Sequence, residues 1–90
     1  MILSAPGQAT AGQPSDSIVE FLDIYPTLVE LCGLPVAAGI EGKSLVPLLL
    51  DPSANIHNAA LSQFPRPHRS GIDHAEYMGY SLRTRDYRYT

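Results

Sequence analysis

The sequence lacks several features that would assign a 90-residue chain to a familiar class. It has one cysteine, Cys32, so no internal disulfide can stabilise it. Its longest apolar run, residues 45–50, stops at Asp51 and is too short to span a membrane. Residues 1–5 lack the basic start and the long apolar stretch of a secretory signal. A formal net charge of −3 argues against general nucleic-acid binding.

What is present fits a small folded domain or a part of one. Hydrophobic residues make up 44% of the chain, which is too many for a disordered protein. The length allows one domain at most. A chain of this size buries only about two-thirds of the surface that its unfolded form exposes. Any independent stability is therefore expected to be marginal.

The charges are distributed unevenly along the chain. Residues 1–50 contain one cation, Lys43, against five acidic residues. Residues 51–90 contain no lysine but five arginines: Arg66, Arg69, Arg83, Arg85 and Arg88. Arginine suits bidentate contact with carboxylate, phosphate or sulfate, although pairing with acids on the surface is the simpler interpretation. We assign Arg83, Arg88 and Asp86 first to such pairing within a hairpin.

Both ends of the chain resemble interrupted strands. Residues 1–5 are predicted to be the end of a buried strand, which is broken by Pro6-Gly7. Residues 87–90 alternate like a strand and then stop without a turn or a polar tail. We therefore expect the chain to be a fragment of a larger domain.

A helix is predicted over residues 24–32. Asp23 has a suitable side chain for its N-cap, Pro26 fits the first turn, and Gly33 is a typical C-terminal stop. Helical spacing predicts one apolar face, made of Ile24, Leu28, Leu31 and Cys32. A second, shorter helix is predicted to begin after Ser44 and to end at Asp51, because Pro52 follows.

Strands are predicted over residues 18–22, 59–64, 80–83 and 87–89. Residues 84–86 form the expected hairpin loop, although they lack the Asn-Gly or Asp-Gly pair that is typical of tight hairpins. Pro65 and Pro67 remove two ladder donors, so residues 65–68 are expected to leave the sheet. A polar loop is expected over residues 69–76.

The residue types alone predict no catalytic side chain and no metal ligand. Cys32 would lie at the C-terminal end of its helix, where the dipole disfavours a thiolate, so we expect a buried structural cysteine. The three histidines, His57, His68 and His74, lack the spacing of a helical metal site. No glycine-rich phosphate loop, Gly-x-Ser-x-Gly turn or recognisable pair of catalytic carboxylates is present.

Several stretches, taken in order, resemble the sulfatase family. Residues 2–7 are similar to a family strand and turn, residues 23–28 (Asp-Ile-Tyr-Pro-Thr-Leu) to its Asp-hydrophobic-Tyr-Pro-Thr-Leu helix, and residues 42–48 to its Gly-x-Ser-Leu-x-Pro-Leu segment. Residues 62–67 (Ser-Gln-Phe-Pro-Arg-Pro) and 78–90 resemble the iduronate-2-sulfatase-like subgroup. The resemblance covers nearly the whole chain.

The resemblance implies an α/β fold of the alkaline-phosphatase-like type. In that fold a large α/β domain precedes a smaller subdomain built on an antiparallel sheet. Residues 1–50, with a strand, a loop and two short helices, would be the end of the large domain. Residues 51–90, with a strand, a two-proline loop and a hairpin, would be the start of the C-terminal subdomain.

The resemblance also implies hydrolysis of sulfate esters. The family nucleophile is a formylglycine made from the first residue of Cys/Ser-x-Pro-x-Arg, and a calcium ion held by Asp and Asn or His binds the sulfate. A metal ion and nearby cations neutralise charge on the transferring group. The substrate of the full-length enzyme would be a sulfated glycan or another small sulfate ester.

No catalytic or metal-binding residue of the family can be carried over to this chain. Cys32 is followed by proline one position too late and lacks the required arginine. Ser4 comes closer, but Gln8 replaces the arginine. Asp73-His74 resembles a metal-binding dipeptide but follows the helical segments, whereas the family pair precedes them. These motifs would lie upstream of Met1, so we expect the chain alone to be inactive.

Arg66 and His68, on the predicted two-proline loop, are our candidates for the substrate rim. Two alternatives stay open from sequence alone. One is a related phospho-ester hydrolase of the same superfamily, which the upstream nucleophile would decide. The other is a non-catalytic module that binds an anionic glycan through its arginines and tyrosines. The resemblance implies a periplasmic, extracellular or lysosomal location.

Overall fold

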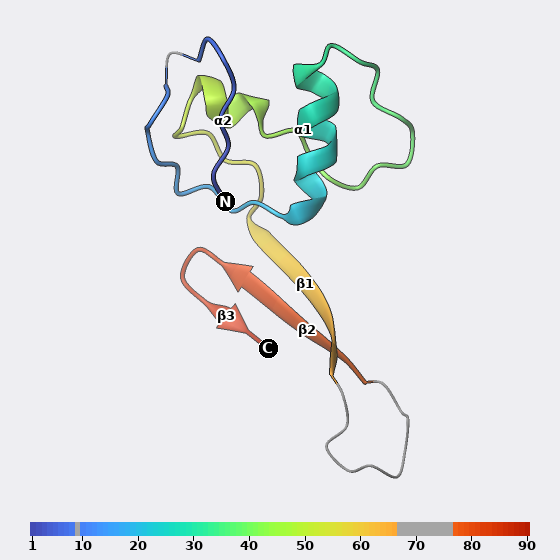
Figure 1. Ribbon diagram of the computed structural model, residues 1–90. Helices are drawn as coiled ribbons and strands as arrows, with labels where there is room; N and C mark the ends of the chain where they lie inside the picture. The colour runs from blue at the N-terminus through green and yellow to red at the C-terminus, as the bar shows by residue number, and fades with distance from the viewer. Residues whose placement is uncertain (9, 67–76) are drawn as a thin grey trace. The chain divides into compact units, whose positions relative to one another are not determined.

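A computed structural model describes residues 1–8, 10–66 and 77–90 (Figure 1). The elements, in order, are a short 3-10 helix η1 (Phe21–Asp23), helices α1 (Ile24–Leu31) and α2 (Val46–Leu50), and strands β1 (Ala59–Arg66), β2 (Tyr77–Thr84) and β3 (Arg88–Tyr89). The chain divides into two compact units, a helical unit over Met1–His57 and a sheet unit over Asn58–Thr90. Among the described residues, no helix is long and apolar enough to cross a membrane.

Helix α1 begins where the sequence predicts and ends one residue earlier. Its end is a Schellman motif, which satisfies carbonyls that the helix leaves unpaired. The Gly33 N–H donates to the Glu30 carbonyl at 2.9 Å, and the Leu34 N–H donates to the Val29 carbonyl at 3.0 Å. Gly33 has φ of +66°, a conformation that favours glycine, so the predicted stop is confirmed.

The strand predicted over residues 18–22 is wrong. Only Ile18 is bridged, to His57, and the chain then turns into η1. The cause is a capping box that the apolar run conceals. The Glu20 N–H donates to the Asp23 carboxylate at 2.8 Å, while the Glu20 side chain accepts from the Asp23 N–H. This reciprocal pair curls the backbone before α1 begins.

The apolar face predicted for α1 is not buried in the structure. Ile24, Leu28, Leu31 and Cys32 are all exposed, and α1 instead buries Pro26, Thr27 and Val29. Cys32 is therefore an exposed thiol rather than a buried structural cysteine. The buried side of α1 is the one from which Asp23 and Thr27 donate or accept hydrogen bonds and on which Val29 joins the small apolar core with Leu45.

The N-terminal segment does not form the predicted strand. Residues 1–5 have no regular structure, and Ile2 is almost fully exposed, although the turn at Pro6-Gly7 is present. Side-chain hydroxyls attach the following loop to the region of α2. Thr10 Oγ1 donates to the Leu49 carbonyl, and Ser15 Oγ donates to the Pro52 carbonyl at 2.6 Å.

Helix α2 matches its prediction closely. Pro47 lies in the first turn, where its missing N–H leaves no bond unmade. The N-cap position is Leu45 rather than Ser44, but the Ser44 hydroxyl does accept the Val46 N–H at 3.2 Å. Asp51 ends the helix in an extended conformation, and its carboxylate accepts the Ser53 N–H at 2.9 Å.

The sheet unit is an antiparallel sheet with the order β1-β2-β3. Strand β1 is longer than predicted, because Pro65 and Arg66 remain paired with Met78 and Tyr77. The expectation that the chain leaves the sheet at Pro65 is therefore wrong. Strand β1 lies at an edge of the sheet, where proline is tolerated because an outward N–H has no ladder partner. The rest of the predicted two-proline loop and the loop over residues 69–76 lie outside the described residues.

The predicted hairpin between β2 and β3 is confirmed. The Thr84 N–H donates to the Tyr87 carbonyl at 2.8 Å, and the Tyr87 N–H donates to Thr84 Oγ1 at 3.0 Å. Neither Arg85 nor Asp86 has a positive φ, so this is not the turn for which Asn-Gly is needed. Instead of an Asn-Gly pair, the Thr84 hydroxyl closes the turn by accepting the Tyr87 N–H.

Candidate functional site

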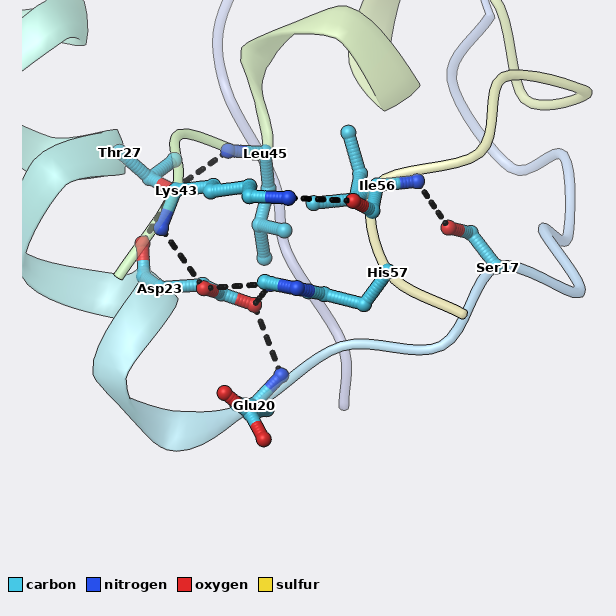
Figure 2. Close-up of polar contacts among 8 residues, drawn as sticks. All are labelled: Ser17, Glu20, Asp23, Thr27, Lys43, Leu45, Ile56 and His57. Carbon is cyan, nitrogen blue, oxygen red and sulfur yellow. Dashed lines mark hydrogen bonds and ion pairs between the residues drawn. The ribbon is translucent and has the colours of Figure 1, made fainter. Parts of the chain in front are cut away.

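The most connected polar group of the helical unit is the Asp23 carboxylate, which is fully buried. It accepts the N–H of Glu20 at 2.8 Å and the N–H of Lys43 at 2.9 Å. The His57 ring nitrogen Nε2 lies 3.0 Å from one carboxylate oxygen and 3.1 Å from the other. Figure 2 shows these groups converging on Asp23 from three separate parts of the chain. A buried carboxylate needs such partners, since an unpaired one is very costly to desolvate.

A second side chain of α1, Thr27, extends the same set of contacts. Its hydroxyl donates to the Asp23 carbonyl at 2.5 Å and accepts the Leu45 N–H at 2.8 Å. Residues four apart lie on one face of a helix, and N–H groups two apart point the same way in an extended chain. Asp23 and Thr27 therefore bind the N–H groups of Lys43 and Leu45 as a matched pair. We call these four residues with His57 the Asp23 clamp.

Gly42 lets the backbone approach the clamp closely. A Cβ atom at this position would lie 2.0 Å from the Leu22 carbonyl oxygen and 3.0 Å from the Asp23 nitrogen. Both are backbone atoms, which cannot swing aside as a flexible side chain would. The requirement here is for space, because Gly42 is not among the glycines with positive φ.

His57 is attached to the clamp by its neighbour as well as by its ring. The Ile56 N–H donates to Ser17 Oγ at 3.1 Å, and Lys43 Nζ donates to the Ile56 carbonyl at 3.2 Å. The His57 side chain is only 12% exposed. The end of the helical unit is thus fixed at both residues, as Figure 2 shows.

The electrostatics of Asp23 follow from its partners. Burial raises the pKa of the carboxyl group, but the hydrogen bonds from Glu20, Lys43 and His57 lower it by more. The pKa of Asp23 therefore lies below its ordinary value of 3.8. The folded state favours the ionised carboxylate.

This direction predicts acid unfolding that depends on Asp23. The unfolded chain binds the proton more tightly, so the stabilisation is complete above the unfolded pKa of about 3.9 and is lost as pH falls through the lower folded value. We expect the urea midpoint to fall with pH in this range, and to fall less steeply in Asp23→Asn. Asp51→Asn is the comparison variant. The pKa of the exposed Asp51 carboxyl is also lowered, by hydrogen bonds from Ser53, but Asp51 lies outside the clamp. An unchanged slope in Asp23→Asn would contradict the assignment.

Glu20, Asp23 and His57 are also the types of residue that bind metal ions. One potential ligand atom from each lies within 4.8 Å of the others. No local pattern in the sequence indicates this group, because His57 is 34 residues from Asp23. Both Asp23 oxygens are engaged by N–H donors and by His57, and the Glu20 side chain is engaged in the capping box. These contacts account for the group without a metal ion.

A cavity of about 640 Å³ lies between the N-terminal loop and α2. Its lining is mainly apolar and small polar, and apart from the chain's N-terminus it offers no titratable group: Met1, Ile2, Leu3, Ser4, Ala5, Gln8, Thr10, Ala11, Gly12, Gln13, Pro14, Ser15, Ser17, Val19, Leu45, Leu48 and Leu49. It offers no acid–base pair or activated nucleophile. The cavity lining therefore adds no reactive side chain to those of the Asp23 clamp.

Comparison with curated proteins identifies the family. The chain is 36% identical to arylsulfatase K of Xenopus laevis over 75 residues, which cover 74% of this chain and 13% of that protein. An alignment of 96 positions with human arylsulfatase K shows 30% identity and covers 99% of this chain and 17% of that protein. An alignment of 108 positions with mouse iduronate 2-sulfatase shows 32% identity and covers 89% of this chain and 20% of that protein.

This chain belongs to the sulfatase family. It spans only 13–20% of the length of these curated sulfatases. No family model matches the chain, and no solved structure matches it. Sulfatase membership implies the alkaline-phosphatase-like fold, of which the described residues form a small mixed piece with a three-stranded antiparallel sheet.

Within residues 1–8, 10–66 and 77–90, the side chains do not fit the formylglycine and calcium of the sulfatase family. Cys32 is exposed at the C-cap of α1 and lacks the Pro-x-Arg that follows a formylglycine precursor. Asp23 and Glu20 are occupied by internal hydrogen bonds, so this pair of acids offers no open calcium site.

The candidates for the substrate rim are not brought together by the described structure. The Arg66 backbone ends β1, paired with Tyr77, and His68 lies outside the described residues. Both assignments stay predictions.

The Asp23 clamp is the feature that could not be predicted from the sequence. Its one local signal was the pairing of Asp23 with Thr27 four residues later on an otherwise apolar helix.

Proposed function

We propose that this chain is a non-catalytic structural segment of a sulfuric ester hydrolase. The observation that carries the proposal is the identity of 30–36% to arylsulfatase K and iduronate 2-sulfatase over most of the chain. The Asp23 clamp supports it, because four of its five residues, all but His57, fall within the family-like stretches 23–28 and 42–48, and the clamp binds only its own members and the backbone.

In this proposal, residues 1–50 form the end of the sulfatase large domain, and residues 51–90 form the start of its antiparallel-sheet subdomain. The whole enzyme would use formylglycine and calcium from outside this chain to hydrolyse a sulfated glycan, such as a glycosaminoglycan, or another sulfate ester. Within this chain, Arg66 and His68 are the proposed contributors to the substrate rim. Resemblance to iduronate 2-sulfatase in substrate choice is part of the same proposal.

An activity assay tests the non-catalytic role. The purified chain, supplied with calcium and an aryl sulfate, is expected to give no turnover above buffer. A chimera gives the positive test, with this chain replacing the matching stretch of human arylsulfatase K. The chimera is expected to keep sulfatase activity within about tenfold of the parent, equivalent to a barrier change below about 1.4 kcal/mol.

Two variants make the chimera informative. Asp23→Ala in the chimera should abolish folding and activity together, whereas Asp16→Ala, at an exposed position, should leave both unchanged. Turnover by the isolated chain would refute the non-catalytic role. A chimera that does not fold would refute structural equivalence with the sulfatase segment, and a folded but inactive chimera would refute a purely structural role. Sequencing the gene to either side would separate a sulfatase from a phospho-ester hydrolase, through the presence or absence of Cys/Ser-x-Pro-x-Arg.

A further inference from the structure

The sheet unit places two arginines directly opposite each other. Arg83 of β2 pairs with Arg88 of β3 in the antiparallel register. Residues directly opposite in such a pair point to the same face, with Cβ atoms about 4.5–5.5 Å apart. Ser81 precedes Arg83 by two residues, so it lies on that face as well. Leu82 and Tyr89, the neighbouring registered pair, lie on the other face.

This register overturns the expected pairing of Arg83 and Arg88 with Asp86. Among residues 1–8, 10–66 and 77–90, no carboxylate lies within ion-pair distance of Arg83, Arg85 or Arg88. Like charges directly opposite each other destabilise a sheet. The hairpin therefore carries two adjacent positive charges on one face, which no carboxylate of the described residues compensates.

Arg88 is held in place within this pair. Its Nε–H donates to Ser81 Oγ at 3.0 Å, and Thr90 Oγ1 donates to the same oxygen at 3.3 Å. Ser81 is only 4% exposed, so the anchor is fixed in the sheet. A guanidinium has five N–H donors, and this contact uses one of them. The remaining four, on the two terminal nitrogens of Arg88, stay available for another acceptor.

The charge of the sheet unit points to an anionic ligand. Asn58–Thr90 contains five arginines against three acids, whereas Met1–His57 contains one lysine against six acids. The sheet unit that carries the arginine pair is therefore net positive, although the chain as a whole is net negative. Guanidinium groups bind oxyanions through paired N–H donors.

We propose that Arg83 and Arg88 form a binding site for a single oxyanion of the sulfate or carboxylate class. Arg88, oriented by Ser81, would bind one pair of oxygens, and Arg83 would bind the same ion from the opposite strand. Binding would relieve the repulsion between the two guanidinium groups. The site goes beyond the proposed function, because it belongs to the sheet unit whether or not the whole protein hydrolyses sulfate esters.

A titration followed by NMR tests this site in the full chain. The Nε–H signals of the arginines are recorded as sodium sulfate, or separately sodium acetate, replaces sodium chloride at constant ionic strength. Saturable shifts are expected at Arg83 and Arg88, with Arg85 unaffected. The anion that binds more tightly identifies the class of the ligand, a sulfated group or a carboxylate. Linear, non-saturating shifts with both anions would overturn the proposal.

Matched variants separate a site from general charge. Arg83→Gln and Arg88→Gln should each weaken binding about tenfold or more, whereas Arg85→Gln, with the same change of charge in the adjacent loop, should weaken it less than twofold. Slow exchange of the Tyr87 amide, which donates to Thr84, verifies that the hairpin is intact in each variant. Equal weakening by all three variants would show that the anion responds only to net charge.

Discussion

Replacing Asp23 by alanine is expected to destabilise the helical unit by about 3 kcal/mol or more, because three buried donors lose a common acceptor. The substitution leaves the N–H groups of Glu20 and Lys43 and the His57 ring without their acceptor. Each buried donor left unsatisfied costs about 1–3 kcal/mol. Since whole domains are stable by only about 5–15 kcal/mol, much of the helical signal should disappear.

Circular dichroism at 222 nm during urea unfolding measures this effect. Asp16→Ala removes the same charge from an exposed position and should shift the midpoint little. His57→Ala should cost less than Asp23→Ala, because the two backbone donors still satisfy the carboxylate. If Asp16→Ala and Asp23→Ala proved equally mild, Asp23 would be a surface charge and the clamp would not exist.

The second large effect is expected from Gly42→Ala. The added methyl group would lie 2.0 Å from the Leu22 carbonyl oxygen and 2.4 Å from its carbonyl carbon. One of the two backbone segments must therefore move, and overpacking of this kind costs about 1–3 kcal/mol or more. The movement also withdraws the Lys43 N–H from Asp23, so the total loss should approach that of Asp23→Ala.

Gly39→Ala is the matched control for Gly42→Ala. Gly39 has φ of +85° but no atom within 4 Å of an added Cβ, so its substitution costs only conformational strain of about 1–2 kcal/mol. The expected order of stability is wild type, Gly39→Ala, then Gly42→Ala. Amide exchange of Lys43 should accelerate strongly only in Gly42→Ala. The reverse order would mean that backbone conformation, and not the close approach, sets the requirement for glycine.

Local rules explain why the elements themselves could be predicted from the sequence. Gly33 marks the end of α1, Pro47 the first turn of α2, and the alternation around Leu82 the second strand. Each of these signals acts within a few residues. Sulfatase membership was predictable for the same reason, since it rests on short stretches in a fixed order.

The contacts between distant residues could not be predicted in this way. The bond from His57 to Asp23 joins positions 34 residues apart, and nothing near either residue indicates the other. The exposed Leu28 shows the limit of periodicity, because helical spacing identifies an apolar face but not whether anything covers it. The opposition of Arg83 and Arg88 depends on strand register, which a shift of one residue would remove.

The Asp23 clamp has a consequence for how the chain tolerates changes in length. Asp23 and Thr27 bind main-chain N–H groups. These bonds depend on where the backbone of residues 43–45 lies and not on which side chain stands at position 43. The exposed connection over residues 34–39 takes no part in these bonds. Insertions, or even new chain termini made by circular permutation, should therefore be accepted in that connection. A single residue inserted between Gly42 and Leu45 would change the spacing of the two N–H groups that Asp23 and Thr27 bind. Changes in length should therefore accumulate in residues 34–39 and not in residues 42–45.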